Sequence, residues 1–302
     1  MEVGTHAAGL FFAALALIGW TALSFFIRLA LRDAPFLRGT ATVTTTNGVL
    51  VTLAAAAYLP WASVVPSLWR TVFLLLAVGL FMIVLSRLTY YFAIRHIGPS
   101  RTLPVATSTP AVTALLAALW LDEPLSLRMF LGLGLLIGGI TAVVRAEPAR
   151  PAGGAGYTPR QRALGWLSAG ATTFLWSLSS VIIKVIVADI PPLGAMMLAI
   201  WIGVPVAWMV ALGFESERAP REIPRGNWRW IFCAALCQTL AVPSYAAALA
   251  RTYAVNVSSV TAMQPLFAIL IAHLFVREAE NVTPRLILGG SLTVGGTLMV
   301  LV

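Results

Sequence analysis

The sequence has few charged residues and few of the side chains that carry acid, base or metal chemistry. Only 10% of its 302 residues are charged, against roughly 25% in an average soluble domain. That scarcity excludes an ordinary soluble enzyme, and 2 Cys are too few for a disulfide framework. Apolar residues are abundant instead, at 59% of the chain with a mean hydropathy of +0.90. This composition is typical of a protein that lies in a lipid bilayer.

Ten apolar stretches are long enough to cross a bilayer as helices, which takes about 20 mostly apolar residues. They cover approximately residues 7–31, 36–58, 70–95, 99–120, 126–144, 162–187, 193–213, 228–250, 255–276 and 284–301. We expect the first to be a span rather than a cleaved signal peptide, because no small-residue cleavage site follows it. The expected fold class is therefore an all-α polytopic membrane protein with ten transmembrane helices.

One break in the apolar pattern divides the chain. The segment EPARPAGGAGYTPRQR, which begins at Glu147, is rich in Gly, Pro and Arg, a composition typical of a flexible linker. We expect a first repeat over residues 1–146, a linker over 147–161 and a second repeat over 162–302.

The two halves repeat the same order of uncommon residues. Trp20, Ser24, Arg28, Asp33 and Pro35 recur 156 residues later as Trp176, Ser180, Lys184, Asp189 and Pro191. Tyr90, Pro110 and Glu123 recur 155 residues later as Tyr245, Pro265 and Glu278, and Gly132, Gly138 and Gly139 match Gly289, Gly295 and Gly296. We assign these glycines to close helix packing. Because each repeat holds five predicted spans, an odd number, the second copy is inverted, as in secondary transporters.

Several of these segments together resemble a known family. They are the Trp followed eight positions later by Arg or Lys in spans one and six, the stretch YYFAIRHIGPS before a Pro-containing fourth span, the motif WLDEP, and the Gly-rich fifth and tenth spans. They are similar to the EamA family of the drug/metabolite transporter superfamily. The resemblance covers the whole chain in two copies and implies a transporter. Within the family, the sequence looks most like YddG-type exporters of amino acids, including aromatic ones.

Basic residues are concentrated in alternate connections between the predicted spans. Assigned to the nearest connection, sixteen of the 20 fall in odd-numbered connections, and the even-numbered ones hold only Arg70, Arg128, Lys184 and Arg251. Cytoplasmic loops carry the excess of Lys and Arg. The odd connections are therefore predicted to be cytoplasmic, with both termini on the other side of the membrane.

All 11 carboxylates fall at predicted span ends or in connections, so none lies in mid-span. A carboxylate inside the membrane is the usual carrier of protons or cations. Its absence indicates transport without a built-in proton carrier, with His96 and His273 as the remaining candidates for coupling. The same scarcity of clustered His and acids argues against a membrane enzyme.

The predicted middle of the bilayer offers aromatic and polar groups. Trp20 and Ser24 share one face of span one, and Trp176 and Ser180 share the equivalent face of span six. We predict that these residues bind substrate. The alternative is contact with lipid or with other helices, because Trp usually prefers the membrane interface.

Spans three and eight add further candidate binding residues. Tyr90 and Tyr245 are related by the repeat, Gln238 lies seven residues before Tyr245 on the same face, and Ser244 follows directly after a proline. A buried Gln is costly in hydrocarbon unless it forms hydrogen bonds, and its partner is either another helix or the substrate. Arg87, three residues before Tyr90, can attract a substrate carboxylate.

Prolines mark candidate hinges. Pro104, Pro110, Pro243 and Pro265 fall in spans four, eight and nine, where each would remove an i to i−4 hydrogen bond and kink its helix. Neighbouring Thr109, Ser244 and Gln264 can bond to the freed carbonyls. A static packing kink is the alternative to a hinge.

We therefore expect an inner (plasma) membrane exporter of small neutral metabolites, above all amino acids with aromatic or hydrophobic side chains. It would work by alternating access through a central cavity between the inverted repeats. No catalytic residue, metal or cofactor is expected. The predicted partners are the small-molecule substrate and the lipid bilayer, with no nucleic acid and a monomeric state. Another cargo class, or a non-transporting receptor or scaffold, is the alternative.

Overall fold

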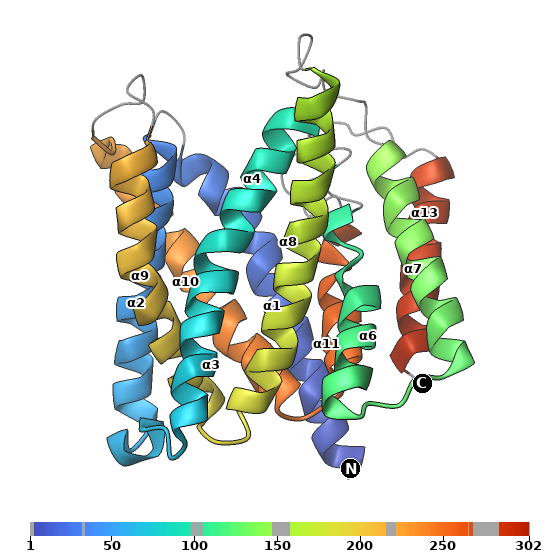
Figure 1. The fold of residues 1–302 in the computed structure, drawn as a ribbon, viewed down its shortest axis with the longest axis horizontal. Coiled ribbons are helices and arrows are strands. Elements are labelled where there is room, and N and C mark those ends of the chain that lie inside the picture. Colours follow the sequence, from blue (N-terminus) through green and yellow to red (C-terminus); the bar gives the residue numbers. More distant parts are fainter. Residues whose placement is uncertain are drawn as a thin grey trace. The chain divides into compact units, whose positions relative to one another are not determined.

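The computed structural model describes residues 3–31, 34–97, 102, 105–146, 158–215, 222–264, 266–267 and 284–301, and every regular element in these ranges is helical (Figure 1). The first half of the chain contains α1 (Val3–Ala30), α2 (Phe36–Tyr58), η1 (Trp61–Val64), α3 (Trp69–Leu80), η2 (Phe81–Leu85), α4 (Ser86–Ile97), α6 (Thr109–Leu121) and α7 (Leu127–Ala146). The second half contains α8 (Pro159–Ile186), α9 (Pro192–Phe214), η3 (Arg225–Asn227), α10 (Trp228–Leu249), α11 (Ala254–Thr261) and α13 (Pro284–Leu301).

Most of these helices begin and end close to the predicted spans, but α6 begins only at Thr109 within the predicted span 99–120, and α11 ends at Thr261 within the predicted span 255–276. Five of them are long and apolar enough to cross a membrane: Gly4–Ile27, Trp69–Tyr90, Pro159–Ile186, Pro192–Phe214 and Arg225–Leu249. Three shorter helices, Thr109–Leu121, Leu127–Ala142 and Leu288–Leu301, are also apolar. The all-helical class is thus confirmed for the described residues, and the full count of ten spans stays a prediction.

Helix α2 forms although it contains a run of threonines, which are poor helix formers in water. Along the run, each of Thr42, Thr44, Thr45 and Thr46 donates its hydroxyl to the carbonyl four residues earlier, at 2.8–2.9 Å. In hydrocarbon a hydroxyl has no water to bond, so this back-bonding satisfies it inside its own helix.

The chain folds into two compact units, and each unit draws on both halves of the sequence. Unit 1 is Met1–Val84 with Ile182–Thr252, and unit 2 is Leu85–Val181 with Tyr253–Val302. One division falls inside η2, a second inside α8 and a third between α10 and α11. The sequence repeats are therefore different from the spatial units, because each repeat contributes helices to both.

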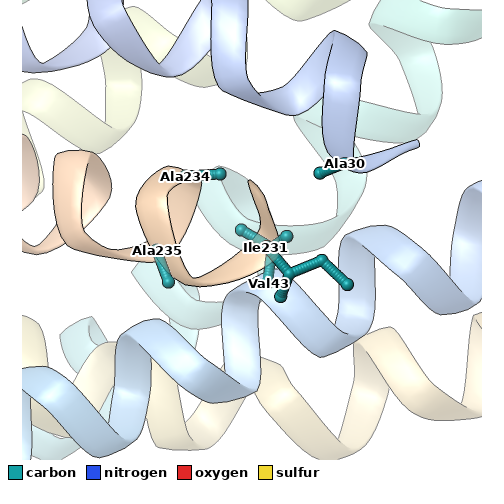
Figure 2. Close-up of a cluster of buried hydrophobic side chains, with 5 residues drawn as sticks. All are labelled: Ala30, Val43, Ile231, Ala234 and Ala235. Atoms are coloured by element: carbon teal, nitrogen blue, oxygen red, sulfur yellow. The ribbon is translucent and has the colours of Figure 1, made fainter. Parts of the chain in front are cut away.

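The core of unit 1 shows how closely its helices pack. Ala30 of α1, Val43 of α2, and Ile231, Ala234 and Ala235 of α10 form one buried cluster (Figure 2). Each of the five is at most 2% exposed. Three of them are alanines, and such small side chains let helix backbones approach closely where no hydrophobic effect drives association.

In unit 1, α2 and α9 are joined by two hydrogen bonds that the internal repeat relates. The indole N–H of Trp201 donates to Thr52 Oγ1 at 2.8 Å, and that of Trp208 donates to Thr45 Oγ1 at 3.0 Å. A shift of 156 residues carries Thr45 onto Trp201. The same shift carries Thr52 onto Trp208, so one contact is made twice with the partners exchanged.

In unit 2, α7 and α13 lie side by side and cross through glycines with the same exchange of partners (Figure 1). A Cβ added to Gly132 would lie 2.9 Å from the carbonyl oxygen of Gly296, and one added to Gly139 would lie 2.7 Å from that of Gly289. A shift of 157 residues carries Gly132 onto Gly289 and Gly139 onto Gly296. These four glycines are packing residues, as predicted, because no side chain fits between the helices. The same assignment is wrong for Gly138 and Gly295, where an added Cβ would meet nothing within 4 Å.

Candidate functional site

Two aromatic pairs combine residues that the sequence singled out separately. In unit 1, the Trp20 ring of α1 lies 5.0 Å from the Tyr245 ring of α10, with the planes tilted by 51°. In unit 2, the Trp176 ring of α8 lies 5.5 Å from the Tyr90 ring of α4, with a tilt of 42°. Each unit therefore carries one Trp–Tyr pair, and each pair joins a helix of one repeat to a helix of the other.

The internal repeat relates the two pairs, and glycines set the register of both. A Cβ on Gly9 would lie 3.0 Å from the Thr252 side chain, and a Cβ on Gly165, which is 156 residues later, would lie 2.7 Å from the Ile97 side chain. Ile97 and Thr252 are themselves 155 residues apart. The same helix crossing is thus built in both units, with a Trp–Tyr pair at the same place along it.

The serines predicted beside the tryptophans bond to their own helices. Ser24 Oγ donates to the Thr21 carbonyl at 2.6 Å, and Ser180 Oγ donates to the Trp176 carbonyl at 2.8 Å. Ser180 is only 2% exposed. Each hydroxyl oxygen keeps lone pairs that can accept a further hydrogen bond, so the prediction that these serines bind substrate is not tested by their geometry.

Helix α10 holds three further predicted residues. Gln238 and Tyr245 are both buried, at 5% exposed each, and lie seven residues apart on one stripe of the helix. Ser244 is buried too, and Pro243 lies inside the helix, as expected for a kink. Arg87 lies in α4, one turn before Tyr90 and half-buried. Its role toward a substrate carboxylate stays a prediction.

The structure does not place the candidate hinge prolines as predicted. Pro110 occupies the first turn of α6, where an N–H has no partner in its own helix to lose. The expectation that Pro110 kinks the middle of a continuous span is therefore wrong in its geometry. Pro104 and Pro265 lie outside the described residues. Thr109 does bond to the carbonyl that Pro110 leaves free, Ala106 O, at 2.6 Å, as predicted.

Sequence reasoning missed a row of hydroxyls on α8 in unit 2. Thr173 Oγ1 donates to the Val105 carbonyl at 2.7 Å, and Ser177 Oγ donates to the Thr109 carbonyl at 3.1 Å. Both acceptor carbonyls belong to the segment where the fourth predicted span is broken. Their spacing of four residues, on a helix already singled out by Trp176, was the available signal. These bonds tie α8 to the backbone of that segment within unit 2.

A π-helical turn, η2 at Phe81–Leu85, was also missed. It interrupts the long third span between α3 and α4, and one division between the two units falls within it. Single π turns inside α-helices occur frequently at functional sites and cause bends. The apolar sequence FMIVL gives no sign of it.

Three carboxylates are engaged at the beginnings of other helices. Both Glu123 oxygens lie 3.0 Å from the N–H of Ala254, the first residue of α11. Glu215 accepts from the N–H of Arg38 in the first turn of α2, at 2.8 Å. Negative charge is favourable there because helix N-termini carry unpaired N–H groups. These acids therefore serve as caps joining distant segments.

Asp189 is the third of these carboxylates, in the connection after α8. Hydrogen bonds from the Ser67 and Thr71 hydroxyls, and from the backbone N–H groups of Leu68 and Ser67, hold the pKa of Asp189 below its usual value. The carboxylate thereby fixes the start of α3. Nearby, Lys184 Nζ donates to the Thr252 carbonyl at 2.8 Å, just past the end of α10.

Within the described ranges, no group of three or more His, Cys, Asp or Glu residues could hold a metal ion. A shallow apolar groove runs along the exposed face of α8, lined by Ala163, Trp166, Leu167, Gly170, Ala171 and Phe174. None of the predicted binding residues lines this groove.

Comparison with known proteins accounts for the repeated architecture. A protein of known crystal structure superposes on the chain with a TM-score of 0.77, at 20% sequence identity, over 97% of this chain and 96% of that chain. At this identity the likeness concerns the fold alone, and a search of curated proteins found no match. The model of the EamA-like transporter family matches residues 7–145 and again residues 163–302. The chain therefore belongs to the EamA-like transporter family, and it is a multi-pass membrane transporter of the drug/metabolite type.

Proposed function

We propose that the protein exports small neutral metabolites, above all amino acids with aromatic or hydrophobic side chains, across the inner (plasma) membrane by alternating access. The observation that carries the proposal is the Trp–Tyr pair found once in each unit. A structural aromatic contact needs no second copy with the same partners, whereas a carrier whose inverted halves exchange roles needs equivalent contacts in both.

The chemistry of the pairs suits such a cargo. A flat apolar side chain stacks on tilted Trp and Tyr rings, an interaction worth about 1 kcal/mol beyond buried area. The ammonium group of an amino acid over the face of Trp20 or Trp176 adds about 1 kcal/mol. Since a zwitterion has no net charge, it needs no buried counter-charge, and the hydroxyls and amide near the pairs are sufficient partners.

The proposal includes transport without a built-in proton carrier. It is supported by the caps described above, because Glu123, Asp189 and Glu215 are already engaged at helix beginnings. We also propose that the protein acts as a monomer in the bilayer with both termini on the non-cytoplasmic side.

The test is flux of radiolabelled phenylalanine and leucine in proteoliposomes that contain the full chain, with and without a pH gradient. We expect saturable flux down the concentration gradient that a pH gradient leaves nearly unchanged. Uphill accumulation driven by the pH gradient would contradict the coupling, and absence of saturable flux for any neutral amino acid would contradict the cargo class.

A further inference from the structure

Gln238 is a largely buried residue whose amide makes no hydrogen bond within the described part of the protein. It lies on α10 and is 5% exposed. Its neighbour Thr239 shows the usual arrangement, since it donates to Asn47 Oδ1 on α2 at 2.9 Å and to the Ala235 carbonyl, also at 2.9 Å. Its amide atoms are not among the buried polar atoms that lack a partner, so they reach accessible space and can bond to a ligand there.

The crossing of α1 and α10 places Gln238 beside the unit 1 aromatic pair. A Cβ on Gly19 would lie 2.9 Å from both the Cys237 carbonyl oxygen and the Ala241 side chain, so α1 touches α10 on either side of Gln238. Trp20, the next residue of α1, contacts Tyr245. Because residues seven apart share one face of a helix, Gln238 and Tyr245 belong to the same stripe of α10.

The other copy of the repeat shows that the fold does not need an amide here. Ile83 stands 155 residues before Gln238. It is 4% exposed and packs against Gly203, whose added Cβ would lie 2.6 Å from the Ile83 side chain. The same position of the repeat is thus filled by an apolar residue in one copy and by an amide in the other.

We propose that Gln238 binds the polar head of the cargo while the Trp20–Tyr245 pair binds its aromatic body, which deepens the proposed function and rests on it. A carboxamide is uncharged, and it donates through its N–H groups and accepts through its oxygen. It can therefore donate to a carboxylate and accept from an ammonium group of the same ligand. The substrate class is a zwitterion with an adjacent flat apolar group, and an analogue that lacks either charge leaves half of the amide unpaired.

The experiment measures binding of phenylalanine to the purified full chain, in competition with phenethylamine, which lacks the carboxylate, and with 3-phenylpropanoate, which lacks the ammonium group. The wild type should prefer phenylalanine over both. Gln238→Leu should reduce that preference about tenfold, the effect of one or two hydrogen bonds to charged groups. It should leave the thermal midpoint of the cargo-free protein nearly unchanged, because the Gln238 side chain makes no hydrogen bond among the described residues.

The matched control is Thr239→Val, on the adjacent position of α10. It removes the bond to Asn47, so it should lower the thermal midpoint and keep the wild-type preference. Gln238→Met, which keeps the side chain's length without its donors and acceptors, repeats the test should the leucine variant fold poorly.

The outcomes separate the two proposals. A wild type that binds none of the three probes contradicts the proposed function. A wild type that prefers phenylalanine, together with Gln238 variants that keep this preference, overturns the role of Gln238 and leaves the proposed function standing. A lower thermal midpoint with unchanged preference would make Gln238 a structural amide, and this also overturns the inference.

Discussion

Units 1 and 2 carry the same Trp–Tyr pair in different surroundings. Beside the pair of unit 2, Thr89 and Thr172 share a hydrogen bond of 2.8 Å between their hydroxyls, which ties α4 to α8. The equivalent positions in unit 1 are Ser244 and Ala16, which make no such bond. Unit 1 instead has the close backbone approach of Gly19 to α10.

The units also differ in their other close crossings, which the repeat does not relate to one another. Unit 1 joins α2 and α9 through indole-to-hydroxyl hydrogen bonds, whereas unit 2 joins α7 and α13 through glycine contacts. The contacts beside the two Trp–Tyr pairs have thus changed between the copies, but the pair itself has not. This difference indicates that helix packing can be achieved by several kinds of contact, whereas the Trp–Tyr pair is the contact that both units keep.

The largest effect is expected at the glycine crossing of unit 2. An added Cβ on Gly139 would collide with the backbone and side chain of Thr293, whereas one on Gly138 would meet nothing within 4 Å. Gly139→Ala should therefore destabilise the protein by about 3 kcal/mol through overpacking. Thermal unfolding in detergent measures this, with Gly138→Ala as the neighbouring control. Equal midpoints for the two variants would contradict the tight crossing.

A smaller effect is expected at the α2–α9 crossing of unit 1, where single hydrogen bonds rather than glycine contacts join the helices. Trp208→Phe and Thr45→Val remove the two ends of one bond. A double-mutant cycle of these changes should give a coupling of about 0.6 kcal/mol, the average for such bonds between membrane helices. A coupling near zero would show that this contact does not hold α2 and α9 together. The two units would then not differ in the way that hydrogen bonds and glycine contacts suggest.

The smallest effect concerns the pH dependence of unit 1. Because hydrogen bonds lower the pKa of Asp189, its carboxylate stabilises the folded state at neutral pH. That contribution is complete above the ordinary Asp pKa of about 4 and is lost as the pH falls through the lower folded-state value. Asp189→Asn should reduce stability slightly at pH 7, and the gap to the wild type should close below about pH 4. A gap that is constant from pH 7 to pH 3 would refute the cap.

Much of the fold was predictable because it depends on local composition. The apolar run from Phe36 to Tyr58 predicts α2 at its observed bounds, and the glycines of the fifth and tenth spans predict close packing. Pro110 was misjudged because its effect depends on where the helix begins. The carbonyls at or just before the start of α6 accept hydrogen bonds from Thr173 and Ser177, which lie on a helix distant in sequence. No local sequence pattern predicts such contacts between distant helices.

The candidate residues were predictable one by one, but their pairing was not. Trp20 and Tyr245 are far apart in sequence, and only the register of α1 against α10 brings their rings together. That register depends on Gly9 and Gly19, which look ordinary in a membrane sequence. The repeat gave Trp176 and Tyr90 as equivalents of these residues, and the structure adds that each Trp pairs with the Tyr of the opposite repeat.

The most direct test of the account is phenylalanine flux in proteoliposomes for Trp20→Ala and Trp176→Ala, measured separately. Trp166→Ala is the control, because Trp166 lies on α8 with Trp176 but is 47% exposed on its outer face. If both pairs contact the cargo, each of the two variants should lose about tenfold or more in flux at wild-type folded amount, and the control should transport normally. Wild-type flux in both Trp20→Ala and Trp176→Ala would contradict the account.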